Sequence, residues 1–284
     1  MTDSEMPFVG SAALAAGNLT RYELRRHHVA VLPNVYLPAR TRPSLQQRTV
    51  AAWLWSGGQA VVAGAAASAL HGAKWVDATV PIELIWRNTH PPAGVLTRND
   101  LLLPGEQQHR RGMAVTTVAR TAFDLGRRGH LGQAVARLDA LANATGLRTA
   151  DVLELARRHR HTRGLRQLEA ALDLVDAGAE SPKETWLRLL LMGGGFPRPT
   201  TQIPVPGPDG RPKYFLDMGW QDLMLAVEYD GEHHLTDRPQ YVWDATRLEY
   251  IRQLGWTHIK VLKEHRGGDV LRRVRAAWNT LTLH

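Results

Sequence analysis

Cysteine is absent from this 284-residue chain, which excludes disulfide bridges, cysteine-ligated zinc sites and thiolate nucleophiles. Long apolar runs are also missing, because no segment approaches the roughly 18 apolar residues of a membrane-spanning helix. The opening MTDSEMPF lacks the basic and apolar regions of a secretory signal peptide. We therefore expect a soluble, cytoplasmic protein with no membrane partner.

Lysine is scarce, so arginine carries most of the positive charge. The chain has 35 basic against 27 acidic residues, a net charge of +8 and an isoelectric point near 10.2. This balance favours a polyanionic partner, with nucleic acid first among them, although an arginine excess can also reflect a GC-rich genome. Residues 1–180 hold 21 basic and 15 acidic residues, so most of the excess lies upstream.

Residues 1–40 predict a winged-helix-like module. The range 11–16 and the segment opened by Thr20, a capping-box residue, are expected helices, and 29–38 is an expected hairpin. In a winged helix a recognition helix enters the major groove, and Arg21 and Arg25 would lie on it. The alternative is a small helical cap with solvated arginines.

Residues 41–148 predict a mixed α/β region with no catalytic spacing. Its expected elements are a helix over 45–55, a buried alanine-rich stretch over 61–70, a strand over 81–86 and a helix within 115–125. Arg120 and Asp124 are four residues apart, which predicts an ion pair on the surface of that last helix.

A helical connector is expected over residues 149–180. Its arginines are candidate phosphate ligands, since each neutralised phosphate releases counterions; a solvated loop is the alternative. The candidates are Arg157, Arg158, Arg160 and Arg163.

The last domain, residues 181–284, has the clearest pattern. Ser181 is an expected N-cap with Pro182 at the first helical position. Strands are expected over 202–205, 213–219, 223–229 and 256–262, and further helices over 241–254 and 269–281. The predicted fold class is therefore α+β or α/β, with the order α-β-β-β-α-β-α in this domain.

Three acids fall on neighbouring strands of this domain. If an even number of residues connects the two strands, Asp217 and Glu228 point to the same face, and Asp230 shares that face with Glu228. Carboxylates facing one another repel, so the group needs a compensating cation. Mg²⁺ binds through one or two carboxylates together with water and phosphate oxygens, which suits this pair.

These residues resemble those of a known superfamily. The element order, the spacing Asp217 … Glu228-Tyr229-Asp230 and a glutamate on the preceding helix resemble the PD-(D/E)xK restriction-endonuclease-like nucleases. VEYDGEHH, the Asp244/Arg247 pair and GWTHIKVLK are similar to a branch related to very-short-patch-repair endonucleases. The upstream residues resemble, more loosely, the winged-helix part of AbiEi-like type IV antitoxins.

The resemblance implies a site for Mg²⁺ or Mn²⁺. Asp217 and Glu228 would bind the ion, with the backbone carbonyl of Tyr229 as a further ligand. Glu184 matches the helix acid that completes such sites through water, and it also fits the capping box opened by Ser181.

The resemblance also implies groups that handle the proton and the phosphate. His234, or its neighbour His233, would act as general base. Arg247 would bind the scissile phosphate, with a surface pair to Asp244 as the alternative. Two lysines, Lys260 and Lys263, would follow the nucleic-acid backbone; solvated lysines are the alternative.

One position departs from the superfamily. Asp230 stands where the superfamily has its catalytic lysine, and an acid cannot stabilise negative charge. Compensation would come from Lys213, Lys260 or Arg247, or from a histidine base.

The sequence therefore predicts a metal-dependent DNA endonuclease, a hydrolase of DNA-repair type, whose basic upstream region holds DNA. The alternative is a catalytically inactive, antitoxin-like regulator that binds DNA with a nuclease fold. A homodimer and a toxin or repair partner stay open.

Overall fold

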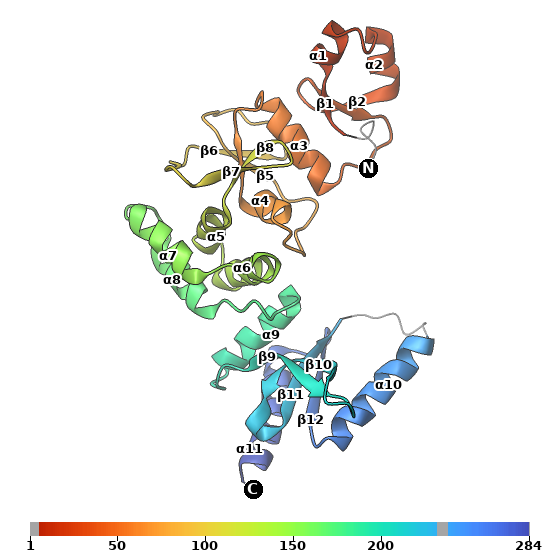
Figure 1. Cartoon of the computed structure of the whole chain (residues 1–284), viewed down its shortest axis with the longest axis vertical. Helices are drawn as coiled ribbons and strands as arrows, with labels where there is room; N and C mark the ends of the chain where they lie inside the picture. Colours follow the sequence, from red (N-terminus) through yellow and green to blue (C-terminus); the bar gives the residue numbers. More distant parts are fainter. Residues whose placement is uncertain (1–5, 232–237, 284) are drawn as a thin grey trace. The chain divides into compact units, whose positions relative to one another are not determined.

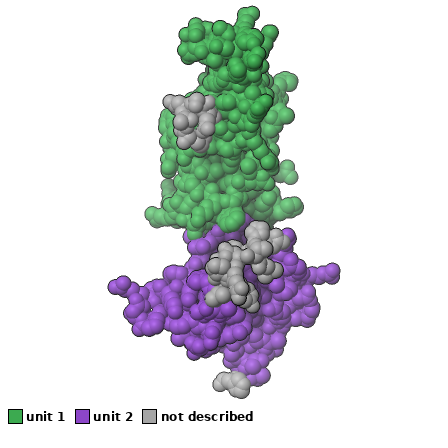
Figure 2. Space-filling view, turned by 90° about the vertical axis from the view of Figure 1, so that its right-hand side faces the viewer, with its two compact units in different colours: residues 1–175 green, residues 176–284 purple. Residues whose placement is uncertain are grey.

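The computed structural model of the chain describes residues 6–231 and 238–283. The fold is mixed α+β, as predicted, and the described residues form three sheets with helices around them (Figure 1). The chain divides into two compact units, Met1–Val175 and Asp176–His284 (Figure 2). None of the helices in the described part combines the length and apolar composition that a membrane crossing requires.

The N-terminal part of the first unit is a small antiparallel sheet in the order β1-β3-β2 with two helices. The predicted capping box is present at the start of the second helix, where Thr20 and Glu23 bond reciprocally. The predicted hairpin is also confirmed, whereas the two-residue β1 is too short for a sequence period to indicate. The elements are β1 (Phe8–Val9), α1 (Gly10–Ala15), α2 (Arg21–His27), β2 (His28–Leu32) and β3 (Val35–Pro38).

A five-stranded mixed sheet in the order β6-β5-β4-β8-β7 forms the centre of the first unit. Its core is made largely of small and branched side chains, such as Ala52, Val62, Leu84 and Val115. The strands are β4 (Val61–Ala63), β5 (Ile82–Ile85), β6 (Val95–Arg98), β7 (Gln107–Arg110) and β8 (Met113–Thr116). The helices are α3 (Leu45–Trp55), α4 (Gly64–Leu70), α5 (Val118–Gly126) and α6 (Leu131–Thr145).

The Arg120–Asp124 pair forms as predicted, but its expected place on the surface was wrong. Arg120 is only 1% exposed, and its Nε donates to Asp124 Oδ2 at 3.0 Å while its Nη1 donates to Glu106 Oε2 at 2.5 Å. Helix α5 packs against several other helices, α4 and α6 among them. The four-residue spacing therefore predicts which acid pairs with Arg120, but it does not predict that the pair is buried.

The two helices expected as a connector belong to the core of the first unit. They are α7 (Thr149–Arg158) and α8 (Leu165–Leu174), and their buried residues pack against α5 and α6. Gly164 joins them with φ at +92°, and a Cβ atom there would lie 2.3 Å from the carbonyl oxygen of Arg127. Only glycine fits this close approach of two backbone segments.

The second unit has the predicted order of helix, three strands, helix, strand and helix. Its sheet runs β12-β11-β10-β9, antiparallel except for the parallel pair β11–β12. The elements are α9 (Pro182–Gly193), β9 (Thr200–Pro206), β10 (Pro212–Trp220), β11 (Leu225–Asp230), α10 (Arg238–Gln253), β12 (Thr257–Leu262) and α11 (Gly267–Thr282).

Two separate apolar clusters hold this unit together. Helices α9 and α11 pack with the sheet through residues that include Leu187, Val227 and Val274. Ile251 of α10 belongs to the other cluster, with Leu216 and Ala226. The acids lie on strands that contribute to both clusters, so the position of the site is fixed by packed core.

Candidate active site

Asp217 and Glu228 meet where the ladder between β10 and β11 stops. Backbone pairing runs from Trp220↔Leu225 to Met218↔Val227, and residues 221–224 connect the strands, an even number as the prediction required. At the next position, hydrogen bonds from backbone N–H groups to the two carboxylates replace the backbone-to-backbone hydrogen bonds of the ladder. The backbone N–H of Asp217 donates to Glu228 Oε1 at 3.3 Å, and the N–H of Tyr229 donates to Asp217 Oδ2 at 3.0 Å.

The Glu228 carboxylate is held by two basic side chains. Arg247 of α10 donates from Nη2 to Oε1 at 2.6 Å and from Nη1 to Oε2 at 2.9 Å, and Nε2 of His258 contacts Oε2. Burial by itself would raise the pKa of Glu228, but the hydrogen bonds from His258 and Arg247 outweigh it and lower the pKa to about 2. Glu228 is therefore ionised at neutral pH.

Asp217 has the opposite electrostatics. Burial, followed by repulsion from Glu228 and Glu184, raises the pKa of Asp217 to about 7. The hydrogen bond from Tyr229 N–H and the charge of Arg247 oppose this shift without cancelling it. Within the described residues no ion pair joins a basic side chain to Asp217. The negative charge of the site is therefore incompletely compensated at this carboxylate.

Glu184 caps its helix, which is one of the two roles that the sequence left open. Its backbone N–H donates to Ser181 Oγ at 3.2 Å, and Ser181 Oγ donates to Glu184 Oε1 at 2.7 Å. The reciprocal bond to Oε2 comes from the N–H of Glu180 at 2.9 Å and not from Ser181, so the expected capping box was wrong in this detail. Burial first, and repulsion from Glu228 among later causes, raises the pKa of Glu184.

Asp230 is paired with a lysine from the neighbouring strand. The parallel register sets Glu228 beside Lys260, and Lys260 Nζ contacts Asp230 Oδ2. A cation thus lies next to the position where the superfamily resembled by this sequence has its lysine.

His258 is a site residue that the sequence reasoning missed. Along β12 the buried Ile259 and Val261 alternate with His258 and Lys260, so the last two share the face of the acids. This alternation in GWTHIKVLK was a usable signal for a polar face on the strand. The contact with Glu228 was not foreseeable, because the two residues are 30 positions apart.

The acids line a cleft of about 410 Å³ together with cationic and aromatic side chains. Lys213 is among them, and its ammonium lies 4.1 Å from the ring centroid of Tyr250. Arg247, expected to bind a phosphate directly, instead holds Glu228 and donates from Nη2 to the carbonyl oxygen of Phe215 at 2.8 Å. Its first role in this structure is to position a carboxylate.

The donor set fits one divalent ion of the Mg²⁺ type. No group of three or more His, Asp or Glu side chains in the described ranges has the arrangement of a protein-only metal cage. Mg²⁺ does not require one, because it binds through one or two carboxylates and keeps several waters. A cation beside Asp217 would relieve the repulsion that raises the pKa of this carboxyl group.

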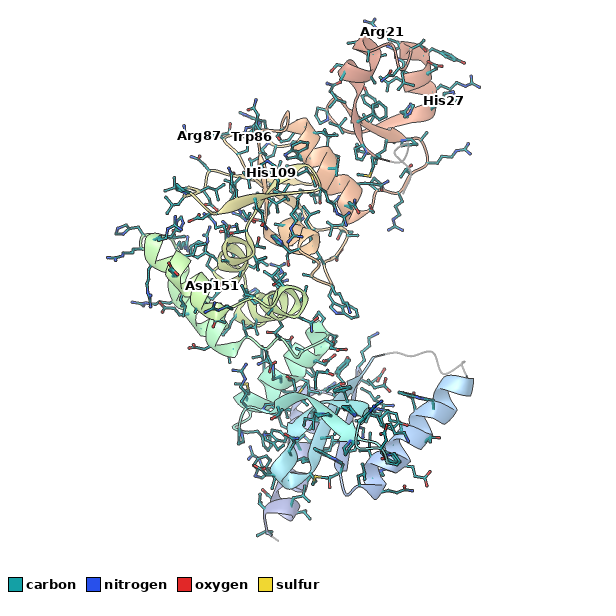
Figure 3. All side chains as sticks on the ribbon, in the orientation of Figure 1. Arg21, His27, Trp86, Arg87, His109 and Asp151 are labelled. Atoms are coloured by element: carbon teal, nitrogen blue, oxygen red, sulfur yellow. The ribbon has the colours of Figure 1, made fainter. Side chains whose placement is uncertain are left out.

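The remaining predicted residues are exposed on other elements or lie outside the described residues. Lys263 is exposed just after β12, and Arg21 and Arg25 are exposed on α2, whose first and last residues are labelled in Figure 3. The arginines predicted from the connector are exposed around the C-terminal end of α7, and Arg158 donates to the carbonyl of Pro104 at 3.1 Å. They are Arg157, Arg158, Arg160 and Arg163. His233 and His234 lie outside the described residues.

The chain is similar to two uncharacterized proteins of Mycobacterium tuberculosis, one from strain H37Rv and one from strain CDC 1551. The identity is 27% over 226 residues in both cases, which covers 79% of this chain and 82% of each relative. No model of a known protein family matches the chain, and no solved structure matches it.

Proposed function

We propose that this chain is a divalent-metal-dependent endonuclease that hydrolyses phosphodiester bonds in DNA. The observation that carries the proposal is the junction of Asp217 and Glu228 on adjacent strands, where burial, followed by the charges of Glu228 and Glu184, raises the pKa of Asp217 to about 7. Such a pair destabilises a fold unless a cation is bound, and a perturbed carboxyl group in a cleft is typical of a functional site.

In this proposal the chain holds the ion through Asp217, Glu228 and the carbonyl of Tyr229. Mg²⁺ or Mn²⁺ would polarise the phosphoryl oxygen and lower the pKa of the attacking water. Arg247 keeps the Glu228 carboxylate in place for this role. Water adds to phosphorus, the bond to the leaving sugar oxygen breaks, and that oxygen takes up a proton.

Two lysines on the cleft supply the positive charge that Asp230, an acid, cannot provide. Lys260 reaches the rim of the cleft from β12, and Lys213 lies at the start of β10. Both would attract a phosphate backbone and offset the charge that develops on the phosphoryl oxygens. Pairing with Asp230 keeps the Lys260 ammonium next to the acids, and Glu184 adds a third carboxyl group nearby.

Binding of duplex DNA is assigned to the first unit. The exposed Arg21 and Arg25 on a capped helix, followed by the β2–β3 hairpin, support this assignment, as does the basic excess of the upstream residues. The chemistry requires neither a cytoplasmic location nor a homodimer.

The proposal is tested by cleavage of labelled duplex, mismatched and single-stranded DNA with Mg²⁺ or Mn²⁺. We expect cutting that requires the metal and that disappears in the Asp217→Ala/Glu228→Ala double variant. The Asp222→Ala variant is the matched control, since it removes an exposed carboxylate outside the cleft. Cutting by the double variant at the wild-type rate would refute the assignment of the site.

A DNA-binding regulator without nuclease activity is the second candidate. The observation in its favour is that both oxygens of Glu228 already accept hydrogen bonds from Arg247 and His258. Calorimetric titration with Mn²⁺ separates the candidates. Binding that depends on Asp217 supports the nuclease, whereas DNA binding without any metal binding or cutting supports the regulator.

A further inference from the structure

Two large aromatic side chains are exposed on the cleft that holds the acids. Trp243 of α10 is 50% exposed and Phe215 of β10 is 51% exposed, and both line the cleft. The metal chemistry proposed above uses neither of them. Other aromatic side chains of this chain are as exposed, so the observation that indicates a ligand is the shared position of these two rings on the cleft of the acids.

Trp243 packs against other aromatic rings. Tyr214 meets Trp243 edge to face at 5.7 Å between ring centroids and meets Tyr250 in the same way at 5.9 Å. Lys213 lies over Tyr250, and the guanidinium of Arg247 lies 5.8 Å from the centroid of Tyr214. The contact with Tyr214 holds the Trp243 ring in place, so stacking of a ligand on this ring costs little side-chain freedom.

Both exposed rings are tied to the acids by short stretches of backbone. Phe215 precedes Asp217 by two residues on β10, and its carbonyl accepts a hydrogen bond from Arg247. Trp243 precedes Arg247 by four residues on α10, one helical turn. A group bound on the rings is therefore a neighbour of the phosphate-facing carboxylates.

We propose that Phe215 and Trp243 form a stacking subsite for unpaired bases, so that the second unit acts on a single-stranded stretch of DNA. The inference rests on the proposed nuclease function and names its substrate class. Aromatic platforms next to basic side chains are how proteins bind single strands, because every base has a face that can stack. In an intact duplex those faces are covered by neighbouring bases.

The size of the cleft agrees with this assignment. Its volume of about 410 Å³ lies in the range of pockets that enclose one small molecule. One nucleotide turned out of a strand fits such a space, whereas a paired duplex does not enter it. Lys213 and Lys260 on the same cleft would bind the phosphates on either side of the stacked base.

The test measures binding without cleavage. The full chain carrying Asp217→Asn is titrated in EDTA into a labelled single-stranded 20-mer and into the same sequence as a duplex, with fluorescence anisotropy as the readout. Trp243→Ala and Phe215→Ala are each expected to weaken single-strand binding by roughly 5- to 100-fold, the measured range for one base–aromatic stack. Duplex binding is expected to change less than about twofold, because it is assigned to the first unit.

Two controls separate stacking from simple loss of structure. Trp243→Phe keeps a ring and should restore most of the single-strand affinity, and Leu254→Ala removes an exposed apolar side chain that does not line the cleft. Unchanged single-strand affinity in both alanine variants, or equal weakening on both DNA forms, would overturn the subsite. Since this assay measures binding without metal, a failure of the separate metal-dependent cleavage assay would count against the nuclease and leave this result standing.

Discussion

Two carboxyl groups of nearly the same chemistry differ at this site because of their neighbours. Glu228 has Arg247 and His258 as hydrogen-bond donors, and its pKa falls to about 2. Asp217 has a backbone N–H and two other acids, and its pKa rises to about 7. Pairs of acids whose pKa values are pushed apart are a recurring feature of catalytic sites.

The raised pKa of Asp217 predicts a pH dependence of stability. Between about pH 4 and pH 7 the folded chain binds a proton at Asp217 that the unfolded chain has released, so the contribution of this group to the free energy of unfolding falls as the pH rises. Because asparagine cannot ionise, the Asp217→Asn variant does not lose this free energy of unfolding as the pH rises. We expect the variant to be more stable than wild type by roughly 1–3 kcal/mol at pH 8 and nearly equal to it at pH 4.

Urea unfolding at the two pH values, followed by circular dichroism, measures this difference. Asp222→Asn is the matched control, because Asp222 is an exposed acid in the turn after β10. Equal stability of wild type and Asp217→Asn at pH 8 would contradict the crowded-charge account.

At the scale of elements, close backbone contacts set what the sequence can vary. Gly164 begins α8 at φ +92° and lies against the carbonyl of Arg127. Gly105 has a similar φ of +85°, but nothing lies within 4 Å of its would-be Cβ. Substitutions at the two glycines therefore distinguish the cost of backbone strain from the cost of a steric clash.

Gly164→Ala is expected to destabilise the first unit by about 2–4 kcal/mol, since it adds a clash with backbone to the strain of positive φ. Gly105→Ala is expected to cost only about 1 kcal/mol, from strain alone. Thermal unfolding of both variants measures the difference. Similar losses in the two would show that the contact with Arg127 contributes nothing.

The predictable part of the fold and site is the part set by local pattern. The capping box at Thr20, the order of elements in the second unit and the meeting of Asp217 with Glu228 follow from spacing and alternation. The features that the sequence did not predict depend on contacts between residues that are far apart in the chain. The depth of Arg120 comes from the elements packed around α5, and the role of His258 comes from a parallel strand that α10 brings back to β11.

At the scale of the whole molecule, the distribution of charge supports the proposal that the first unit binds duplex DNA. Its basic residues include exposed arginines on α2 and around the end of α7. Each phosphate contact releases counterions, so duplex affinity should fall steeply with salt concentration. The salt slope thereby counts the arginines that touch DNA.

Arg21→Ala/Arg25→Ala is expected to weaken duplex binding uniformly across sequences. It should also reduce the slope of log K against log salt by about 1.8, since each phosphate contact contributes about 0.9. Anisotropy titrations between 50 and 200 mM salt, roughly the range over which such losses are large, measure both quantities. Arg148→Ala, which removes an exposed charge before α7, is the control. An unchanged slope in the double variant would place the duplex elsewhere.

The arrangement of β11 and β12 has a consequence for how the protein folds while the ribosome synthesises it. Glu228 emerges 30 residues before His258, with Arg247 in between. At roughly 5–20 residues per second, the last partner follows about 1.5–6 s later. Until then the nascent hairpin carries its acids without their cations and must keep them in water. The carboxylates can therefore become buried together with their partners only after β12 has been made, so the cleft that they line closes late in translation.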